Sequence, residues 1–280
     1  MNYFKGRKAV LATMHGKEKV IAPLLKELDI EVVVPLALNT DLFGTFTRDI
    51  KRAGNQLEAA RAKAKVALAI TGLDLAIASE GSFGSHPAIP WVQSNLELVL
   101  LVDKENDIEI RGHARSSETN ANGIYVSSFA EAKKIVKEWG FPKHGLVVRN
   151  SENGNTIYKG ITTYEELENR IQQLLGIIFR KKVFIETDLR AHMNPTRMKN
   201  IGIATEDLLK NMKSFCPKCQ CPGFVVIDTK KGLPCGGCGL ATDMISAYIY
   251  GCQKCKYEEK RLRPDKKETA DPGQCNYCNP

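Results

Sequence analysis

The sequence lacks the features of a membrane or secreted protein. No run of about eighteen apolar residues, the length needed to cross a bilayer, occurs in its 280 residues. The start, MNYFKGRKAVLATMHGK, has neither the apolar core nor the cleavage site of a signal peptide. We therefore expect a soluble cytoplasmic protein without a membrane partner. A content of 43% hydrophobic residues is ample for one large domain or two.

A concentrated band of basic residues is also missing. The net charge is +8, but no stripe of lysine and arginine stands out along the chain. Proteins that bind nucleic acid usually cluster these residues on one face, so the sequence supports nucleic acid only weakly as a partner. No internal repeat and no low-complexity segment is present either.

Cysteine is missing from most of the chain, since none of the nine cysteines precedes Cys216. Eight of them form CxxC pairs, a spacing that lets two thiolates bind one tetrahedral zinc ion. The pairs are Cys216 with Cys219, Cys235 with Cys238, Cys252 with Cys255, and Cys275 with Cys278. In a chain without secretion signals, this pattern indicates metal rather than disulfides. We expect two structural zinc ions, each bound by four cysteines.

The order of the CxxC pairs does not show which two pairs bind the same zinc ion. Fifteen residues separate the first two pairs and nineteen separate the last two, and both gaps fit two successive zinc ribbons. We expect this sequential pairing. The main alternative is cross-bracing, in which the first pair joins the third and the second joins the fourth. Cys221 is left over, and we do not expect it to be a ligand.

The rest of the chain has the pattern of an α/β domain with a mixed sheet flanked by helices, because apolar runs alternate with amphipathic segments. Strands are expected at residues 8–13, 30–34, 73–78, 96–102, 108–114, 146–149, 156–159 and 182–185, and helices at 20–28, 56–70, 128–139, 163–178 and 195–212. In the helix over 56–70, Ala60 and Ala64 face the sheet and Lys63 lies on the solvated side. We predict an α/β domain over residues 1–212 and a double zinc-ribbon domain over residues 213–280.

A candidate site lies in the stretch Leu73–Pro87. A buried strand is followed by SEGSFGSH, in which glycines and hydroxyls surround the single carboxylate of Glu80. Ligands of open α/β sheets bind beyond the carboxyl ends of strands. We therefore predict a ligand-binding turn in which Glu80 is catalytic and His86 contacts the substrate. The alternative is a polar turn whose carboxylate caps nearby amides.

Further segments could complete this site. Lys17 and Lys19 lie in a strand-to-helix turn, where backbone amides can bind an anion, although lysines there are otherwise solvated. The polar segment Asn39–Ile50 is a candidate wall. A second polar concentration, Glu186–Arg197, also follows a strand. In it we assign Asp188 and His192 as catalytic and Arg190, Asn194 and Arg197 as substrate-binding. The alternative is a salt-bridged surface loop that caps the next helix.

Four blocks within residues 8–212 carry a resemblance to a known family: LATMHGKEKV, GTF with LEAARAKA, LAIASEGSF and RAHMNPTRM. They resemble the phosphate turn, the Asn-Ala-x-x-Lys-Ala helix, the acidic strand and the Ser-His-Arg segment of the inosine-triphosphate pyrophosphatase superfamily. His15, Ala59 and Glu80 depart from that pattern, which commonly has asparagine, asparagine and two aspartates there. The resemblance implies a hydrolase of nucleotides or other phosphorylated small molecules that uses magnesium or manganese. The chain also resembles an uncharacterised bacterial family with a cysteine-rich tail, which implies no function.

The sequence supports two classes of function. The first is a metal-dependent hydrolase whose site joins the two polar clusters. The second is a zinc-ribbon binding or assembly protein that contacts nucleic acid, a protein partner or a second copy of the chain through its tail. A deep polar cleft would favour the enzyme. A basic face with exposed Tyr248, Tyr250, Tyr257 and Tyr277 would favour the binding protein.

Overall fold

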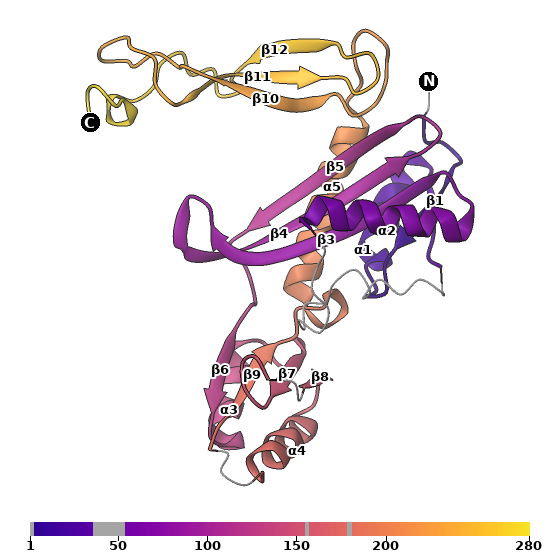
Figure 1. The fold of residues 1–280 in the computed structure, drawn as a ribbon, viewed down its shortest axis with the longest axis vertical. Coiled ribbons are helices and arrows are strands. Elements are labelled where there is room, and N and C mark those ends of the chain that lie inside the picture. The colour runs from indigo at the N-terminus through magenta and orange to yellow at the C-terminus, as the bar shows by residue number, and fades with distance from the viewer. Residues whose placement is uncertain (1–2, 36–53, 155–156, 178–180) are drawn as a thin grey trace. The chain divides into compact units, whose positions relative to one another are not determined.

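The computed structural model describes residues 3–35, 54–154, 157–177 and 181–280 (Figure 1). The candidate wall Asn39–Ile50, which includes the GTF block, lies outside these residues. Within the described ranges, no helix is both long enough and apolar enough to span a membrane.

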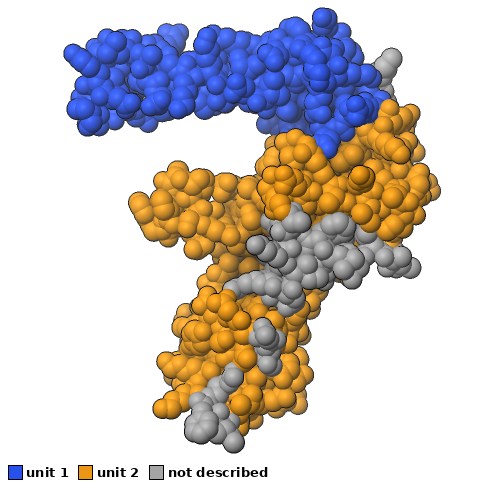
Figure 2. All heavy atoms as spheres, in the orientation of Figure 1, with its two compact units in different colours: residues 1–3, 106–110, 209–280 blue, residues 4–105, 111–208 orange. Residues whose placement is uncertain are grey.

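The chain divides into two compact units (Figure 2). The large unit consists of Phe4–Glu105 and Arg111–Leu208, and the tail unit consists of Leu209–Pro280 with Asn106–Ile110 and Met1–Tyr3. The expected division between residues 212 and 213 had placed Asn106–Ile110 in the first domain. The side-chain amide of Gln253 accepts a hydrogen bond from the backbone amide of Glu109 and donates one to the backbone oxygen of Glu109. These bonds help join the short segment to the tail, and the sequence could not show them.

The large unit contains a five-stranded mixed sheet in the order β2-β1-β3-β4-β5. Its strands are β1 Lys8–Ala12, β2 Glu31–Val33, β3 Leu75–His86, β4 Ile89–Asp103 and β5 Ile108–Ser116, of which residues 108–110 are counted with the tail unit. β1 runs parallel to β2 and β3, and β3 pairs with β4 in an antiparallel hairpin. The first four residues of β3 are fully buried, as expected for a strand covered on both faces.

β3 is longer than the sequence pattern predicts. The stretch SEGSFGSH does not form a turn, because Glu80, Gly81 and Ser82 pair with Leu98, Glu97 and Leu96 of β4. The turn falls at residues 87–88, where Pro87 has no amide to donate to the ladder. The prediction of a ligand-binding turn at Glu80 is therefore wrong, and this carboxylate lies within a strand.

Helices accompany the five-stranded sheet. They are α1 Glu18–Leu25, which continues as the short helix η1 Lys26–Leu28, α2 Gln56–Thr71, and α5 Pro195–Met212. α2 begins at a capping box between Asn55 and Glu58 and ends at Gly72, whose φ of 68° suits glycine. Its alanines Ala60 and Ala64 pack against the apolar side chains of β1, β3 and β4.

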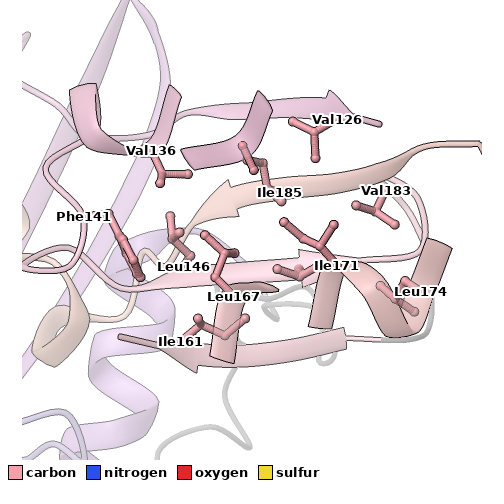
Figure 3. Close-up of a cluster of buried hydrophobic side chains, with 12 residues drawn as sticks. Val126, Val136, Phe141, Leu146, Ile161, Leu167, Ile171, Leu174, Val183 and Ile185 are labelled. Carbon is pink, nitrogen blue, oxygen red and sulfur yellow. The ribbon is translucent and has the colours of Figure 1, made fainter. Parts of the chain in front are cut away.

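A second sheet in the large unit, ordered β6-β9-β7-β8, is antiparallel throughout. The elements are β6 Gly123–Val126, α3 Phe129–Glu138, β7 Leu146–Arg149, β8 Ile157–Ile161, α4 Tyr164–Leu175 and β9 Val183–Thr187. Ser128 and Thr163 cap the two helices through their side-chain oxygens. Figure 3 shows apolar side chains of both helices and all four strands pointing toward one another, which gives this part of the unit its own core.

The tail unit contains a three-stranded antiparallel sheet in the order β10-β11-β12. Its strands are β10 Val225–Lys231, β11 Ile245–Gly251 and β12 Glu258–Leu262. Two further short helices in the described residues are η3 Ala191–Met193 of the large unit and η4 Pro272–Gln274 of the tail unit. The predicted fold class, an α/β fold with a mixed sheet flanked by helices and a C-terminal module with two four-cysteine groups, is confirmed.

Candidate functional site

Lys17 is a buried basic group at the start of α1. It is the N-cap residue of that helix and is only 6% exposed. Its Nζ donates hydrogen bonds to Ser79 Oγ at 2.8 Å and to the backbone oxygen of Ser79 at 3.2 Å. Both acceptors are neutral, so neither bond supplies a negative charge for the ammonium.

Glu80 is buried and paired with Lys63 of α2. Side chains alternate along β3, so Glu80 lies on the same side as Ala78, which packs against α2. Gln56, the first residue of α2, donates to the backbone oxygens of Glu80 and Leu96 at 3.3 and 2.9 Å. The start of α2 is therefore tied to the strand segment that carries the carboxylate.

A second buried ion pair joins α5 to β4. Arg197 Nε donates to Glu97 Oε1 at 2.8 Å, and the two side chains are 1% and 0% exposed. Arg197 Nη1 also donates to the backbone oxygen of Leu189 at 2.7 Å. Asn95 donates to the same carboxylate and accepts from Asn200, each at 2.9 Å. These additional bonds offset the cost of burying two charges.

We call these five charged side chains the buried charge cluster. Its basic members are Lys17, Lys63 and Arg197, and its acidic members are Glu80 and Glu97. As far as the structure describes the chain, Lys63 and Arg197 each have a carboxylate partner and Lys17 bonds only to neutral oxygens. Among these five side chains, the positive charges exceed the negative charges by one when Lys17 is protonated.

The surroundings of Lys17 bring its pKa close to neutral pH. Burial lowers the pKa of Lys17 to about 7, because a buried ammonium loses its hydration. The positive charges of Arg197 and Lys63 lower this pKa as well, whereas Glu80 and Glu97 raise it. An anion beside Lys17 would favour the charged form.

The structure brings together three of the residues that the sequence marks for the site, namely Lys17, Glu80 and Arg197. Lys19 is exposed and lies outside the buried charge cluster. His86 is six residues along β3 from Glu80, roughly 20 Å in an extended strand. Its Nδ1 accepts a hydrogen bond from the backbone amide of Ala88 at 3.2 Å. His86 is thus a residue of the hairpin end and is not close to Glu80.

Asp188 and Arg190 form an ion pair with each other. Arg190 Nη2 donates to Asp188 Oδ2 at 2.6 Å, and the backbone amide of Gly160 donates to the same oxygen at 3.2 Å. The Asp188 side chain has no exposed surface. These bonds brace the segment after β9, which is the arrangement of the salt-bridged loop considered as the alternative for this segment.

Asn194 is also engaged within the protein. It is 1% exposed; its Oδ1 accepts from the backbone amide of Arg197 at 3.0 Å, and its Nδ2 donates to the backbone oxygen of Asn120 at 3.2 Å. The first bond caps the N-terminus of α5. His192, in contrast, is exposed and stacks on His15, with ring centroids 5.0 Å apart and planes 20° apart.

The cysteines of the tail converge into two tetrads. None of the nine cysteines is in a disulfide. The first tetrad is Cys216, Cys219, Cys252 and Cys255, and the second is Cys235, Cys238, Cys275 and Cys278. Sγ–Sγ distances are 3.7 and 3.5 Å in the first and 3.8 and 3.7 Å in the second. Four zinc–sulfur bonds of about 2.3 Å in a regular tetrahedron place the sulfurs about 3.8 Å apart, so each tetrad could hold one zinc ion.

The turn of each CxxC pair has the same backbone geometry. The amide of the residue after the second cysteine donates to the carbonyl oxygen of the first. These donors are Gln220, Gly239, Lys256 and Asn279, at 2.9, 2.9, 3.1 and 2.9 Å. Gln220 and Lys256 have φ angles of 58° and 59°, a left-handed conformation that costs a residue with a side chain about 1 kcal/mol. The turns at Gln220 and Lys256 therefore direct their paired thiolates toward one point at the cost of local strain.

The expected sequential pairing is wrong, because the first pair joins the third and the second joins the fourth. One strand crosses each gap between successive pairs: β10 in the first, β11 in the second and β12 in the third. Since these strands are antiparallel, successive pairs alternate between the two ends of the sheet. A zinc ribbon with sequential pairing needs a hairpin in the gap to bring the chain back. Cys221 is buried but belongs to neither tetrad, as expected.

The tetrads and most of the buried charge cluster lie within one family match. A family model described as "Domain of unknown function (DUF6671)" covers residues 63–280. The chain belongs to this family. The matched range includes Lys63, Glu80, Glu97, Arg197 and both tetrads, but it begins after Lys17. No curated protein and no solved structure matches the chain, so the resemblance to the inosine-triphosphate pyrophosphatase superfamily stays a prediction.

Sequence reasoning missed two members of the buried charge cluster. Lys63 was assigned to the solvated side of its helix, yet it is 7% exposed. Its position one residue before the buried Ala64 was the available signal, because Lys63 lies at the border of the sheet-facing side. Glu97 was not recognised as a charged residue within an apolar strand, where an unpaired carboxylate would be costly. That cost could have prompted a search for its partner.

Proposed function

We propose that the large unit binds a phosphorylated small molecule at Lys17 and hydrolyses it. The observation that carries this proposal is the bonding of Lys17, a buried basic group whose hydrogen bonds to the described residues go to neutral oxygens of Ser79. A buried charge without a counter-charge is costly, and a phosphate oxygen would supply that counter-charge. Lys17 also stands at the N-terminus of α1, where the first backbone amides favour an anion.

In this proposal the carboxylate of Glu80 takes part in the chemical step. In a hydrolysis it would orient the attacking water or share a divalent ion with the phosphates of the substrate, since such ions are often bound by one or two carboxylates plus substrate oxygens. Its partner Lys63 keeps the carboxylate in place in the absence of substrate. We expect magnesium or manganese to be required, because phosphoryl transfer depends mainly on positioning and charge neutralisation.

The test is a panel of nucleoside triphosphates and sugar phosphates assayed with magnesium or manganese. Glu80→Gln should lower turnover by at least about 100-fold, whereas the exposed Glu138→Gln should not change it. Glu80→Gln also leaves Lys63 without its carboxylate, so the fold of the variant must be checked by circular dichroism. Phosphate release that is absent from the wild type, or equal in the wild type and a folded Glu80→Gln, would reject the hydrolase.

The second candidate is a binding or assembly function of the tail unit. Tyr277 is 73% exposed and Leu262 is 78% exposed, and these residues could contact a protein partner or a second copy of the chain. A nucleic-acid face is less favoured, because the Tyr250 ring is covered by the guanidinium of Arg261 at 4.4 Å and Tyr257 stacks on Phe224. Zinc in the tetrads would have no open position for water, so we assign it to folding the tail.

A further inference from the structure

The hydrogen bonds of Lys17 suit both protonation states of its amine. The backbone oxygen of Ser79 accepts in either state, and the Ser79 hydroxyl can accept from an ammonium or donate to the lone pair of a neutral amine. The other two basic groups differ. Lys63 forms an ion pair with the carboxylate of Glu80, and the guanidinium of Arg197 does not lose its proton in proteins. Lys17 is therefore a basic member of the buried charge cluster whose hydrogen bonds allow both a charged and a neutral amine.

Charged groups face Lys17 from four elements. Lys63 of α2 and Arg197 of α5 are positive, and Glu80 of β3 and Glu97 of β4 are negative. With a neutral Lys17 these four charges balance. Burial and the two cations bring the pKa of Lys17 to about 7, so above neutral pH the site without ligand holds mostly the neutral amine.

We propose that this site takes up one proton on Lys17 together with each anion that it binds. The inference rests on the function proposed above, because it requires an anion at Lys17. A negative charge within hydrogen-bonding reach raises the pKa of a lysine by about 1–3 units. The affinity for an anion of fixed charge is then constant below pH of about 7. Above it, the affinity falls about tenfold per pH unit until the pKa of the bound state is reached.

Two imidazoles lie beside the same turn, and proton uptake by them must be distinguished from proton uptake by Lys17. His15 and His192 stack on each other, and His192 Cβ lies 3.8 Å from the position that a side chain on Gly16 would take. The proton count is therefore taken well above neutral pH, where an ordinary imidazole stays neutral. A double variant, His15→Gln with His192→Gln, checks that the count does not change.

The experiment is isothermal titration of the full chain with inorganic sulfate, whose double negative charge does not change over the pH range used. Each titration is run in two buffers of different ionisation enthalpy, at pH of about 6 and of about 8.5. With the pKa of Lys17 raised by about 1–3 units on binding, we expect uptake of about 0.2 to 0.9 proton per sulfate at the higher pH and about 0.1 at the lower. Lys17→Met should abolish the uptake, whereas Lys26→Met, an exposed lysine of η1, should keep it.

Three outcomes would overturn the inference. Sulfate binding with no proton uptake at either pH rejects it and leaves the proposed function standing. Uptake that persists in Lys17→Met assigns the proton to another group and also rejects it. If sulfate does not bind at all, the anion site fails, and the proposed function fails with it. The proton count of the wild type at two pH values needs no variant, so it decides the matter even if Lys17→Met does not fold.

Discussion

The cross-braced pairing of the cysteines can be tested with two matched variants, each with four cysteines replaced by serine. The first variant removes one complete tetrad, namely Cys216, Cys219, Cys252 and Cys255. The matched control removes the first two pairs along the chain, namely Cys216, Cys219, Cys235 and Cys238. Cross-bracing leaves one intact tetrad in the first variant and two separate half-sites in the control. Sequential pairing would give the reverse.

The expected difference follows from the length of the strands. β12 has five residues, about 17 Å at about 3.3 Å per residue, and it separates the two pairs that remain in the control. All sulfurs of an intact tetrad lie within 4.8 Å of one another. The half-sites of the control are therefore too far apart to share an ion. A structural zinc site is worth about 10–16 kcal/mol, so losing half of its ligands removes tight binding.

The assay is zinc content per chain after dialysis against a weak chelator. We expect two zinc ions in the wild type, one in the first variant and none in the control. Zinc retained by the control and lost from the first variant would establish sequential pairing and refute the cross-braced arrangement. A wild-type content near one ion would remove the model of two sites.

Three other predictions concern stability. Arg197→Met leaves the buried carboxylate of Glu97 without its partner and should lower the free energy of unfolding in urea by about 3–5 kcal/mol, while adding Glu97→Met should recover much of it. Gly112→Ala should lower the melting temperature, because the new methyl group would overlap the backbone of α5; Gly84→Ala, with no described atom within 4 Å, should change it far less. Gln220→Gly should stabilise the zinc-loaded tail by about 1 kcal/mol, measured by chelator-induced unfolding.

Each of these predictions has a clear contrary result. An Arg197→Met protein as stable as the wild type would mean that the ion pair is not buried in solution. Equal melting temperatures for the two alanine variants would contradict the packing of α5 against β5. A loss of stability in Gln220→Gly would show that the side chain of Gln220 contributes more than its backbone strain costs.

The sequence by itself determined the local features of this protein. The CxxC spacing identified all eight cysteines of the tetrads, because two thiolates on one turn bind one ion whatever the rest of the chain does. Serine and threonine capped α3 and α4 as their spacing predicts, since a helix cap involves only three or four residues of chain. The alternation of apolar runs gave the α/β class for the same reason, because burial on one face fixes the period of each element.

The tertiary structure decided everything that depends on which segments meet. Whether β10 returns in a hairpin or crosses the sheet once cannot be read from a gap of fifteen residues, and that choice alone sets the pairing of the tetrads. The length of β3 depended on a partner strand that begins at Ile89. Glu80 pairs with Lys63 only because α2 packs on one side of β3. Arg197 pairs with Glu97 only because α5 packs near β4. Partners 17 and 100 residues apart in sequence leave no local pattern, because a buried charge requires a counter-charge but does not specify where along the chain it comes from.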